Sequence, residues 1–387
     1  MYDLARRAIR SRRASAAYDL VLEAIRANPD HEAARRVLGY QKYRGGWYTP
    51  FEVHKLAAGE VWHEQFGWVR KDKVRLYEDE KRPGPGNHWI PAVEDVRLHR
   101  EIRDGWDIKT EHYTVRTNAG LEVGVALGAK LENLYRLWQQ LFIRYYASEA
   151  DVVGLFGGRA RGARAESPRY QVVYFRDRDD YNRALRAAVP NIDISVGYYR
   201  ADARTAFFFA GKDSDERTLY HEATHQLFHQ SRAVSSNVGR TANFWIVEGI
   251  AMYMETLRQE NGYYVLGGLD DERVHAARFR LLEDDFYVPL AEFCTYGMEK
   301  LQTDPRIARL YSQAAGLTLL LVHYDGGRYR DALVAYLDAV YSGRDKPDTL
   351  AQLTGTTFPE LDKQYREFLE AGKKKTEGTQ GKAEGAE

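Results

Sequence analysis

Residues 218–230 (TLYHEATHQLFHQ) contain three histidines spaced four positions apart and a glutamate beside the first of them. On an α-helix, positions i and i+4 lie on one face with Cβ atoms about 5–6 Å apart, so His221 and His225 can direct two imidazoles at one point. Glu222 lies about 100° round the helix from His221. Two neutral nitrogens for a metal ion, and a separate carboxylate as general base, are the groups that a hydrolytic zinc centre needs.

A third candidate ligand, Glu248, lies inside the nearly unbroken apolar segment FWIVEGIAMYMET, residues 244–256. An ionised carboxylate among apolar neighbours is strongly disfavoured unless a cation or hydrogen-bond donors compensate its charge. A zinc ion would compensate it, and the set His221, His225 and Glu248 leaves a fourth coordination position for water. We therefore predict one Zn²⁺ ion per chain, bound by these three residues.

Two further side chains compete for roles at this site. Glu255 comes seven residues after Glu248 on the same helical face, where it can accept a hydrogen bond from a ligand histidine. The alternative for Glu255 is a solvated helix end. His229 comes one turn after His225, but a third histidine on one straight helix would lie about 12 Å along the axis from the first. We therefore predict that His229 lies at the rim of the site and is not a ligand.

The first ninety residues predict two small units and a linker. In residues 1–41 the apolar side chains fall at helical spacing on two segments, which resembles a tetratricopeptide-type hairpin that could bind a protein partner; an ordinary packed hairpin is the alternative. In residues 42–80 the pair Gly-Trp occurs twice, at Gly46 and Gly67, and predicts two copies of a small β element. Their tryptophans fit packing better than binding. Residues 81–91 have the proline and glycine content of a linker.

Residues 92–371 predict an α+β domain that holds the two candidate metal helices. Alternation in WDIKTEHYTVRT and YQVVYF predicts strands, and residues 195–210 predict two strands around a turn just before the histidine helix. Helical periodicity covers residues 121–146 and nearly everything after Phe244. Residues 372–387 contain too few apolar groups to fold, so we predict a disordered tail.

The segments HEATH and FWIVEGIA together resemble the gluzincin metallopeptidases of the peptidase MA-like superfamily. In that family a His-Glu-x-x-His helix is completed by a glutamate within a Trp-x-x-Glu-Gly-x-Ala segment of a following helix. Residues 310–324 resemble the later helix on which aminopeptidase-type members carry a tyrosine that stabilises the tetrahedral intermediate. The resemblance gives this role to Tyr311, for which simple packing is the alternative.

The resemblance covers residues 106–369 and implies a thermolysin- or aminopeptidase-like zincin domain. Such a domain has a small sheet, the His-Glu-x-x-His helix and then a mostly helical subdomain. The chain as a whole is most similar to an uncharacterised bacterial branch with a tetratricopeptide-like hairpin at its N-terminus.

Several features depart from the better-known members of that superfamily. The gap between His225 and Glu248 is a few residues longer, which indicates a loop inserted between the two metal helices. The chain contains no Gly-Ala-Met-Glu-Asn segment, which disfavours amino-terminal exopeptidase specificity. Metzincins are excluded, because Phe228 stands where their glycine would be and Ser231 where their third histidine would be.

The resemblance implies zinc-dependent peptide-bond hydrolysis of the endopeptidase kind, with Glu222 as general base and Tyr311 as hydrogen-bond donor to the oxyanion. We expect a peptide or protein substrate to lie extended along an edge strand formed by Gly197, Tyr198 and Tyr199, for which plain sheet core is the alternative. Two other functions stay open. One is a catalytically inactive metal-binding scaffold or peptide-binding module, which the presence of Glu222 disfavours, and the other is a zinc hydrolase of a non-protein amide or ester.

Composition limits the partners and the compartment. The 56 basic residues balance 56 acidic ones, so no overall field favours nucleic acid or an anionic membrane. Cys294 is the only cysteine, which excludes an internal disulfide and a thiolate metal cluster. The longest apolar run, AGLTLLLV, is far below the roughly 18 residues that span a bilayer, and the start lacks the apolar core of a signal peptide. We expect a cytoplasmic protein, or an exported one if further repeats and a signal peptide precede residue 1.

Overall fold

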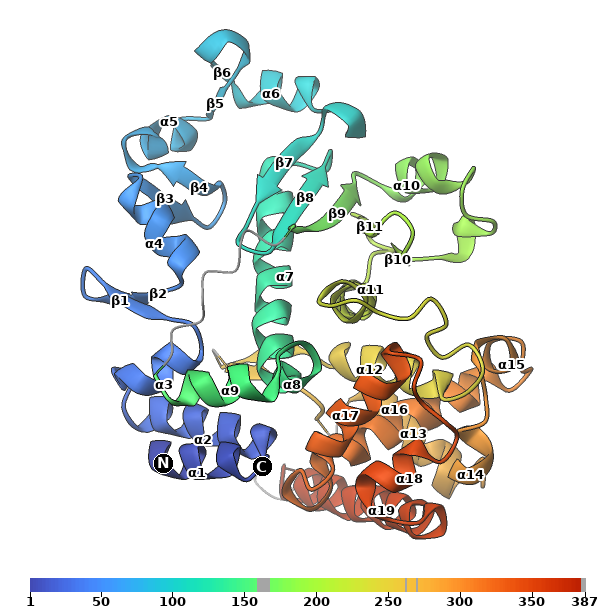
Figure 1. Cartoon of the computed structure of the whole chain (residues 1–387). Helices are drawn as coiled ribbons and strands as arrows, with labels where there is room; N and C mark the ends of the chain where they lie inside the picture. The colour runs from blue at the N-terminus through green and yellow to red at the C-terminus, as the bar shows by residue number, and fades with distance from the viewer. Residues whose placement is uncertain (159–167, 262, 269–270, 384–387) are drawn as a thin grey trace. The chain divides into compact units, whose positions relative to one another are not determined.

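The secondary structure of the chain is a mixture of α-helices and short β-strands, which confirms the α+β class. The computed structural model (Figure 1) describes residues 1–158, 168–261, 263–268 and 271–383. It divides into two units, of which the first comprises Met1–Ile143 and Ala147–Gln226, and the second Arg144–Tyr146 and Leu227–Glu387. The predicted hairpin, β module and linker all fall in the first unit, whereas residues 92–371 are divided between the two.

Three helices open the first unit: α1 (Tyr2–Arg10), α2 (Ala14–Ala27) and α3 (Glu32–Val37). The two predicted helical segments correspond to α2 and α3. Helix α1 is additional, and it packs on α2 through a narrow face that includes Ala5 and Ile9. Leu4, Ala5, Ala8 and Ile9 do fall at helical spacing, so α1 is a helix that the sequence analysis missed.

Three consecutive units, each a β-hairpin followed by a helix, occupy residues 41–98 (Figure 1). The first is β1 (Gln41–Tyr43), β2 (Gly46–Tyr48) and α4 (Pro50–Ala57); the second is β3 (Glu60–His63), β4 (Gly67–Arg70) and α5 (Val74–Glu78); the third is β5 (Lys81–Pro83), β6 (Trp89–Pro91) and α6 (Ala92–Leu98). Each hairpin is antiparallel. The segment predicted as a linker therefore forms a third copy, and its Gly86 takes the left-handed backbone conformation of a turn, with φ 67°.

A tryptophan recurs every 21 residues in the second strand of each hairpin, at Trp47, Trp68 and Trp89. The ring of Trp68 packs edge-on against Phe51 of α4 at a centroid distance of 6.1 Å. The ring of Trp89 packs in the same manner against Tyr77 of α5 at 5.5 Å. Two of the three tryptophans therefore pack against the helix of the preceding unit, which accords with the packing interpretation.

A five-stranded mixed sheet in the order β10-β11-β9-β8-β7 follows these units. The strands are β7 (Trp106–Lys109), β8 (Tyr113–Thr117), β9 (Tyr170–Phe175), β10 (Tyr198–Arg200) and β11 (Thr205–Phe209). The pairs β7/β8 and β10/β11 are antiparallel, and the pairs β8/β9 and β9/β11 are parallel. The predicted strands are confirmed; β10 forms one edge of the sheet, and β11 is the last strand before the histidine helix.

Helix α7 (Leu121–Leu141) packs on β7 and β8, and its buried Glu132 fixes the turn between them. Glu132 accepts hydrogen bonds from Thr110 Oγ1 (2.6 Å) and from the backbone N–H of His112 (2.6 Å). Burial opposes ionisation of this carboxyl, but the hydrogen bonds from His112 and Thr110 keep the pKa of Glu132 below its ordinary value. The first unit also contains α9 (Glu149–Phe156), α10 (Arg178–Leu185) and most of α11 (Glu216–Gln230), and α8 (Ile143–Tyr146) lies at the division of the units.

The second unit is mainly helical, as the sequence predicts. Its helices are α12 (Phe244–Met254), α13 (Glu272–Leu282), α14 (Leu290–Phe293), α15 (Met298–Gln302), α16 (Ile307–His323), α17 (Arg330–Tyr341), α18 (Thr349–Thr354) and α19 (Phe358–Ala383). A hairpin of β12 (Arg258–Glu260) and β13 (Tyr263–Val265) is the exception. The core forms where α12 and α13 pack on α16. Within the described parts of the chain, none of the helices combines the length and the apolar character needed to cross a bilayer.

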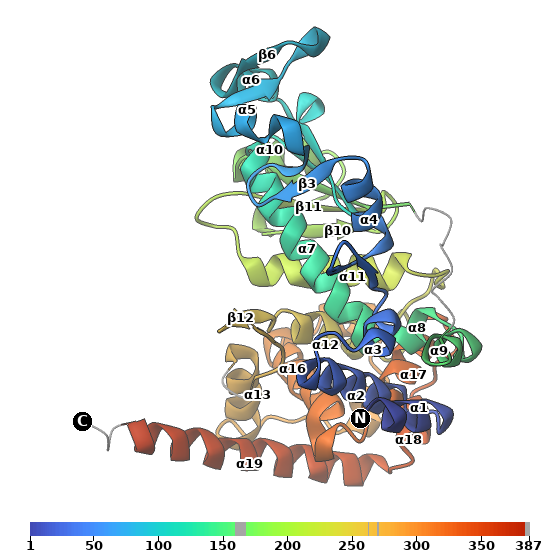
Figure 2. The same ribbon diagram turned by 90° about the vertical axis from the view of Figure 1, so that its left-hand side faces the viewer.

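Helix α19 differs from the predicted disordered tail, because its backbone is helical from Phe358 to Ala383 (Figure 2). Residues 372–383 contain four lysines but also three glycines and two threonines, so helix propensity does not explain their helical backbone. Residues 384–387, the end of the predicted tail, lie outside the described residues.

Candidate metal centre

Helix α11 (Glu216–Gln230) carries the His-Glu-x-x-His segment on one continuous helix. The Nε2 atoms of His221 and His225 lie 3.0 Å apart, with the ring planes at 79° to each other. Two ligands at 2.0–2.1 Å from a tetrahedral zinc ion would lie about 3.3 Å apart. The 3.0 Å separation is that of a hydrogen bond between the two rings, so both imidazoles face the same point and would move apart by about 0.3 Å to share a metal ion.

The opposite face of α11 holds the histidines in place. Leu219, Ala223 and Leu227 on this face are buried, as the sequence predicts. In the last turn, the backbone carbonyl of Phe228 accepts a hydrogen bond of 2.7 Å from Tyr145 Oη. The second unit thus contains both the end of α11 and the tyrosine that holds it.

His229 packs edge-on against Tyr341, with ring centroids 5.7 Å apart. It is not a member of the group of possible metal ligands found among the described residues. This environment accords with the prediction that His229 is not a ligand.

Glu222 is held by the backbone of the sheet edge. Its Oε2 atom accepts a hydrogen bond of 2.8 Å from the N–H of Tyr199, in the middle of β10. Tyr199 pairs with Ala206 of β11 on the other side of the strand. The N–H of Tyr199, which faces away from the sheet, therefore orients the carboxylate of Glu222, the residue predicted to act as general base.

The predicted substrate strand has little space at this edge. Gly197 is buried, its N–H and carbonyl are bonded to Ser195 Oγ (3.3 and 2.6 Å), and a Cβ at this position would lie 2.7 Å from Thr218 Cγ2. Tyr199 is buried, and Tyr198 packs at the margin of an apolar cluster within the first unit. These surroundings favour the sheet-core alternative for Tyr198 and Tyr199, and a substrate strand at β10 stays a prediction.

Ser195 is a residue that sequence reasoning missed. Its Oγ atom lies 2.9 Å from the hydroxyl of Tyr181, whose pKa burial raises to about 12. The same Oγ atom bonds both backbone groups of Gly197, so the pair braces the chain just before β10. No local sequence signal indicates this pairing, because Tyr181 belongs to α10 and reaches Ser195 only in the folded chain.

Glu248 occupies the buried helix α12, in which every residue from Phe244 to Met254 is buried. Its exposed fraction is 8%, so it is the buried acidic side chain in an apolar helix that the sequence predicts. The neighbouring Gly249 lets α12 approach α16 closely. A Cβ atom at this position would lie 2.4 Å from Thr318 Oγ1 and 3.0 Å from the carbonyl oxygen of Ala314.

We expect Gly249→Ala to lower the free energy of unfolding by about 1–3 kcal/mol, because the added methyl group must push α12 and α16 apart. Urea unfolding followed by circular dichroism measures the change. Gly157→Ala is the matched control, since the nearest atom to its Cβ would be the carbonyl oxygen of Gly154 at 3.4 Å. Equal stability of Gly249→Ala and wild type would show that α16 can move far enough to accommodate the methyl group without loss of stability.

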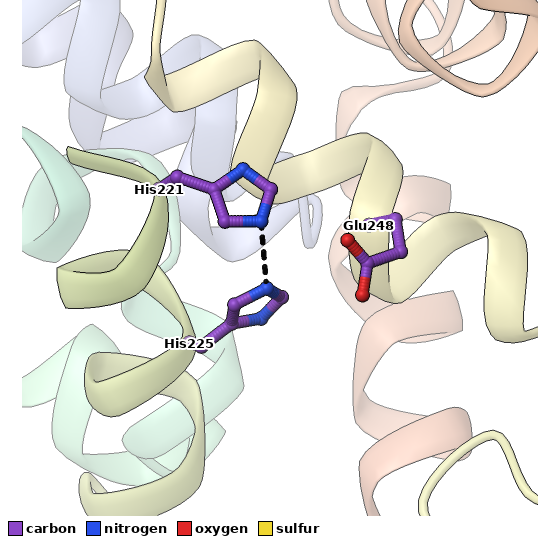
Figure 3. A group of neighbouring side chains, drawn as sticks. All are labelled: His221, His225 and Glu248. Atoms are coloured by element: carbon purple, nitrogen blue, oxygen red, sulfur yellow. Dashed lines mark hydrogen bonds between the residues drawn. The ribbon is translucent and has the colours of Figure 1, made fainter. Parts of the chain in front are cut away.

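His221, His225 and Glu248 form the group of possible metal ligands found among the described residues (Figure 3). The histidines belong to the first unit and the glutamate to the second. Their use as one ligand set is therefore a proposal that needs support from within each unit.

Glu255 is 5% exposed, so the alternative of a solvated helix end is wrong. Its carboxylate accepts a hydrogen bond of 2.8 Å from Nε of Arg273, which lies in α13. No local sequence pattern indicates this partner. Whether Glu255 also orients a ligand histidine stays a prediction.

Tyr311 lies half-buried in the first turns of α16. It comes three residues before Ala314 and seven before Thr318, the two residues that meet Gly249, so it shares the face of α16 that packs on α12. A hydrogen bond of 3.0 Å between Tyr253 Oη and His323 joins the later turns of both helices, which therefore run in the same direction. Tyr311 is thus level with the early turns of α12, the part that leads into Glu248.

Comparison of the chain with protein-family models and with curated proteins finds no match. The class of protein therefore has to be argued from the residues themselves. The groups that carry this argument are the paired imidazoles of α11, the oriented Glu222 and the buried Glu248.

Proposed function

We propose that the chain is a zinc-dependent metallopeptidase of the gluzincin kind that cleaves peptide bonds within a chain. The observation that carries the proposal is the pair of facing imidazoles on one face of α11, beside a carboxylate, Glu222, that the N–H of Tyr199 holds apart from them. A purely structural zinc site is closed by four protein ligands and has no use for a separately oriented acid.

The ligand set is supported from within each unit. In the first unit, the facing Nε2 atoms of His221 and His225 provide two ligands that need to separate by only about 0.3 Å to share a zinc ion. In the second unit, Glu248 is a buried carboxylate in an apolar helix, a position that a divalent cation stabilises.

Zinc bound there would supply a Lewis acid that polarises a carbonyl group and lowers the pKa of water. Glu222 would act as the general base, and the N–H of Tyr199 keeps one of its oxygens in place while the other takes the proton. Tyr311 would donate a hydrogen bond to the oxyanion as the carbonyl carbon becomes tetrahedral. Each of these groups comes from a different element, so their relative positions depend on tertiary packing.

The zinc assignment predicts about one zinc ion per purified chain, and a large loss on removal of a ligand. We expect His225→Ala and Glu248→Ala to weaken zinc binding by more than the roughly 10–100-fold that loss of an outer-shell partner costs. Competition with a chromophoric chelator measures the dissociation constant, and circular dichroism confirms the fold of each variant.

His229→Ala is the matched control, because it removes the same side chain one turn further along α11 and should keep zinc. Full zinc retention by Glu248→Ala would contradict the ligand set and direct attention to His229 or Glu255. A peptide-library cleavage profile of the zinc-loaded wild type then tests the reaction. Zinc without peptide cleavage would favour a scaffold, or a hydrolase of another amide or ester.

A further inference from the structure

The segment between the two proposed metal helices, residues 231–243, contains no helix or strand. The resemblance to gluzincins implies that this segment is longer than the equivalent one in their better-known members. Because this segment has no regular secondary structure, helix α11 does not set the direction in which α12 begins. Contacts at the first residues of α12 must therefore set the position of the helix, and with it the position of Glu248.

Asn243 makes these contacts from a fully buried position directly before α12. Its Nδ2 atom donates to Asp345 Oδ2 (2.7 Å) and to the carbonyl oxygen of Lys346 (2.9 Å). Its Oδ1 atom accepts from the hydroxyl of Tyr336 (2.6 Å). Its backbone N–H donates to the carbonyl oxygen of Cys294 at 3.0 Å.

The backbone of Asn243 is left-handed, with φ 55° and ψ 21°. Asparagine tolerates this conformation better than most residues, so one residue both turns the chain and bonds its surroundings. The next residue, Phe244, donates its N–H to the carbonyl oxygen of Tyr296 at 3.1 Å. The entry to α12 is thus fixed to the segment after α14, to α17 and to the segment after α17.

We propose that Asn243 is a positioning residue for metal binding, which acts by holding the start of α12 so that Glu248 is aimed at the ion. Glu248 follows five residues later, less than one and a half turns, and a helix is stiff over that length. A shift or rotation at residue 243 is therefore passed on to the carboxylate. The inference rests on the proposed zinc ligands, and it adds a residue outside the ligand set that controls their affinity.

Asn243→Asp tests the inference with almost no change of shape. Aspartate also tolerates the left-handed conformation, but it loses both Nδ2 donors and places a carboxylate against Asp345, whose own pKa is already raised by burial. We expect the zinc dissociation constant to rise about 10–100-fold, as for the loss of other outer-shell partners. Asn243→Gly replaces the aspartate variant if that variant does not fold. Glycine removes the side-chain hydrogen bonds and keeps the left-handed backbone conformation at little cost.

Two controls separate positioning from general effects of the change. Asn237→Asp alters an exposed residue of the same segment and should leave zinc affinity unchanged. Asn191→Gly alters another left-handed asparagine, with φ 61°, far along the chain from α12, and should also leave it unchanged.

A double-mutant cycle distinguishes positioning from loss of stability alone. If Asn243 acts through Glu248, then Asn243→Asp should weaken zinc binding in the wild-type background but add nothing in the Glu248→Ala background. The residual binding to two histidines can be measured by calorimetry at high zinc concentration, while urea unfolding of the metal-free proteins reports stability separately.

Equal weakening of zinc binding in both backgrounds would overturn the inference, and so would wild-type affinity in Asn243→Asp and Asn243→Gly. Wild-type protein that binds no zinc would instead overturn the proposed function, and this inference with it. Zinc binding by the wild type with unchanged affinity in both Asn243 variants would remove the inference alone.

Discussion

Glu222→Gln should keep zinc bound while peptide hydrolysis falls by about 10²–10⁴-fold. Glutamine has the size of glutamate, and its amide oxygen can still accept the hydrogen bond that Tyr199 donates over 2.8 Å to the wild-type carboxylate. It cannot take a proton from water at neutral pH. The expected result is therefore a folded, metal-loaded protein without its general base, measured as zinc per chain and as kcat on the best peptide from the library.

Glu216→Gln is the matched control on the same helix. Glu216 accepts a hydrogen bond of 2.6 Å from the hydroxyl of Tyr220 in the first turn of α11, away from the proposed ligands. This variant should retain wild-type zinc content and kcat. Full activity in Glu222→Gln would show that another group accepts the proton, and loss of zinc in that variant would make Glu222 part of the metal binding itself.

Tyr311→Phe should lower kcat by about 10²–10³-fold with little change in KM, zinc content or stability. The hydroxyl is expected to bond the substrate oxygen only when negative charge develops on it, so the ground-state complex loses almost nothing. Steady-state kinetics with one peptide substrate separate kcat from KM, and thermal unfolding reports stability.

Tyr253→Phe shows what the loss of a structural hydroxyl looks like in the same unit. Tyr253 is buried, and its hydroxyl lies 3.0 Å from Nε2 of His323, whose pKa burial lowers to about 4. Its removal should lower the free energy of unfolding by about 1 kcal/mol and leave kcat near wild type. If Tyr311→Phe behaves in this way, Tyr311 is a packing residue and Tyr198 becomes the donor to test, whereas a loss of kcat in Tyr253→Phe would make Tyr253 the donor.

The parts of the site that sequence analysis predicted depend on local order along the chain. His221 and His225 share a face because they are one turn apart, and Glu248 is conspicuous because its immediate neighbours are apolar. The strands β10 and β11 were predicted from alternation within residues 195–210. Such patterns arise from secondary-structure periodicity, which a single sequence contains.

The contacts that hold these residues could not be predicted in this way. Asn243 bonds to Asp345, and Glu255 bonds to Arg273, across intervals that only the packed fold closes. The backbone N–H that orients Glu222 gives no signal in the side-chain sequence at all. Proline and glycine in residues 81–91 also suit either a linker or a tight hairpin, and only the strand pairing distinguishes the two.

The hairpin and helix units of residues 41–98 have a consequence for how the protein can change over evolutionary time. Helix α4 packs on β3, and α5 packs on β5, so each unit contacts the next one along the chain. In such an array, stability is approximately a sum of unit and nearest-neighbour terms. If one whole unit were inserted or lost, the two units on either side would still present compatible surfaces to each other. Homologous chains should therefore differ in length here in steps of one repeat, and they should retain Trp68 and its counterparts.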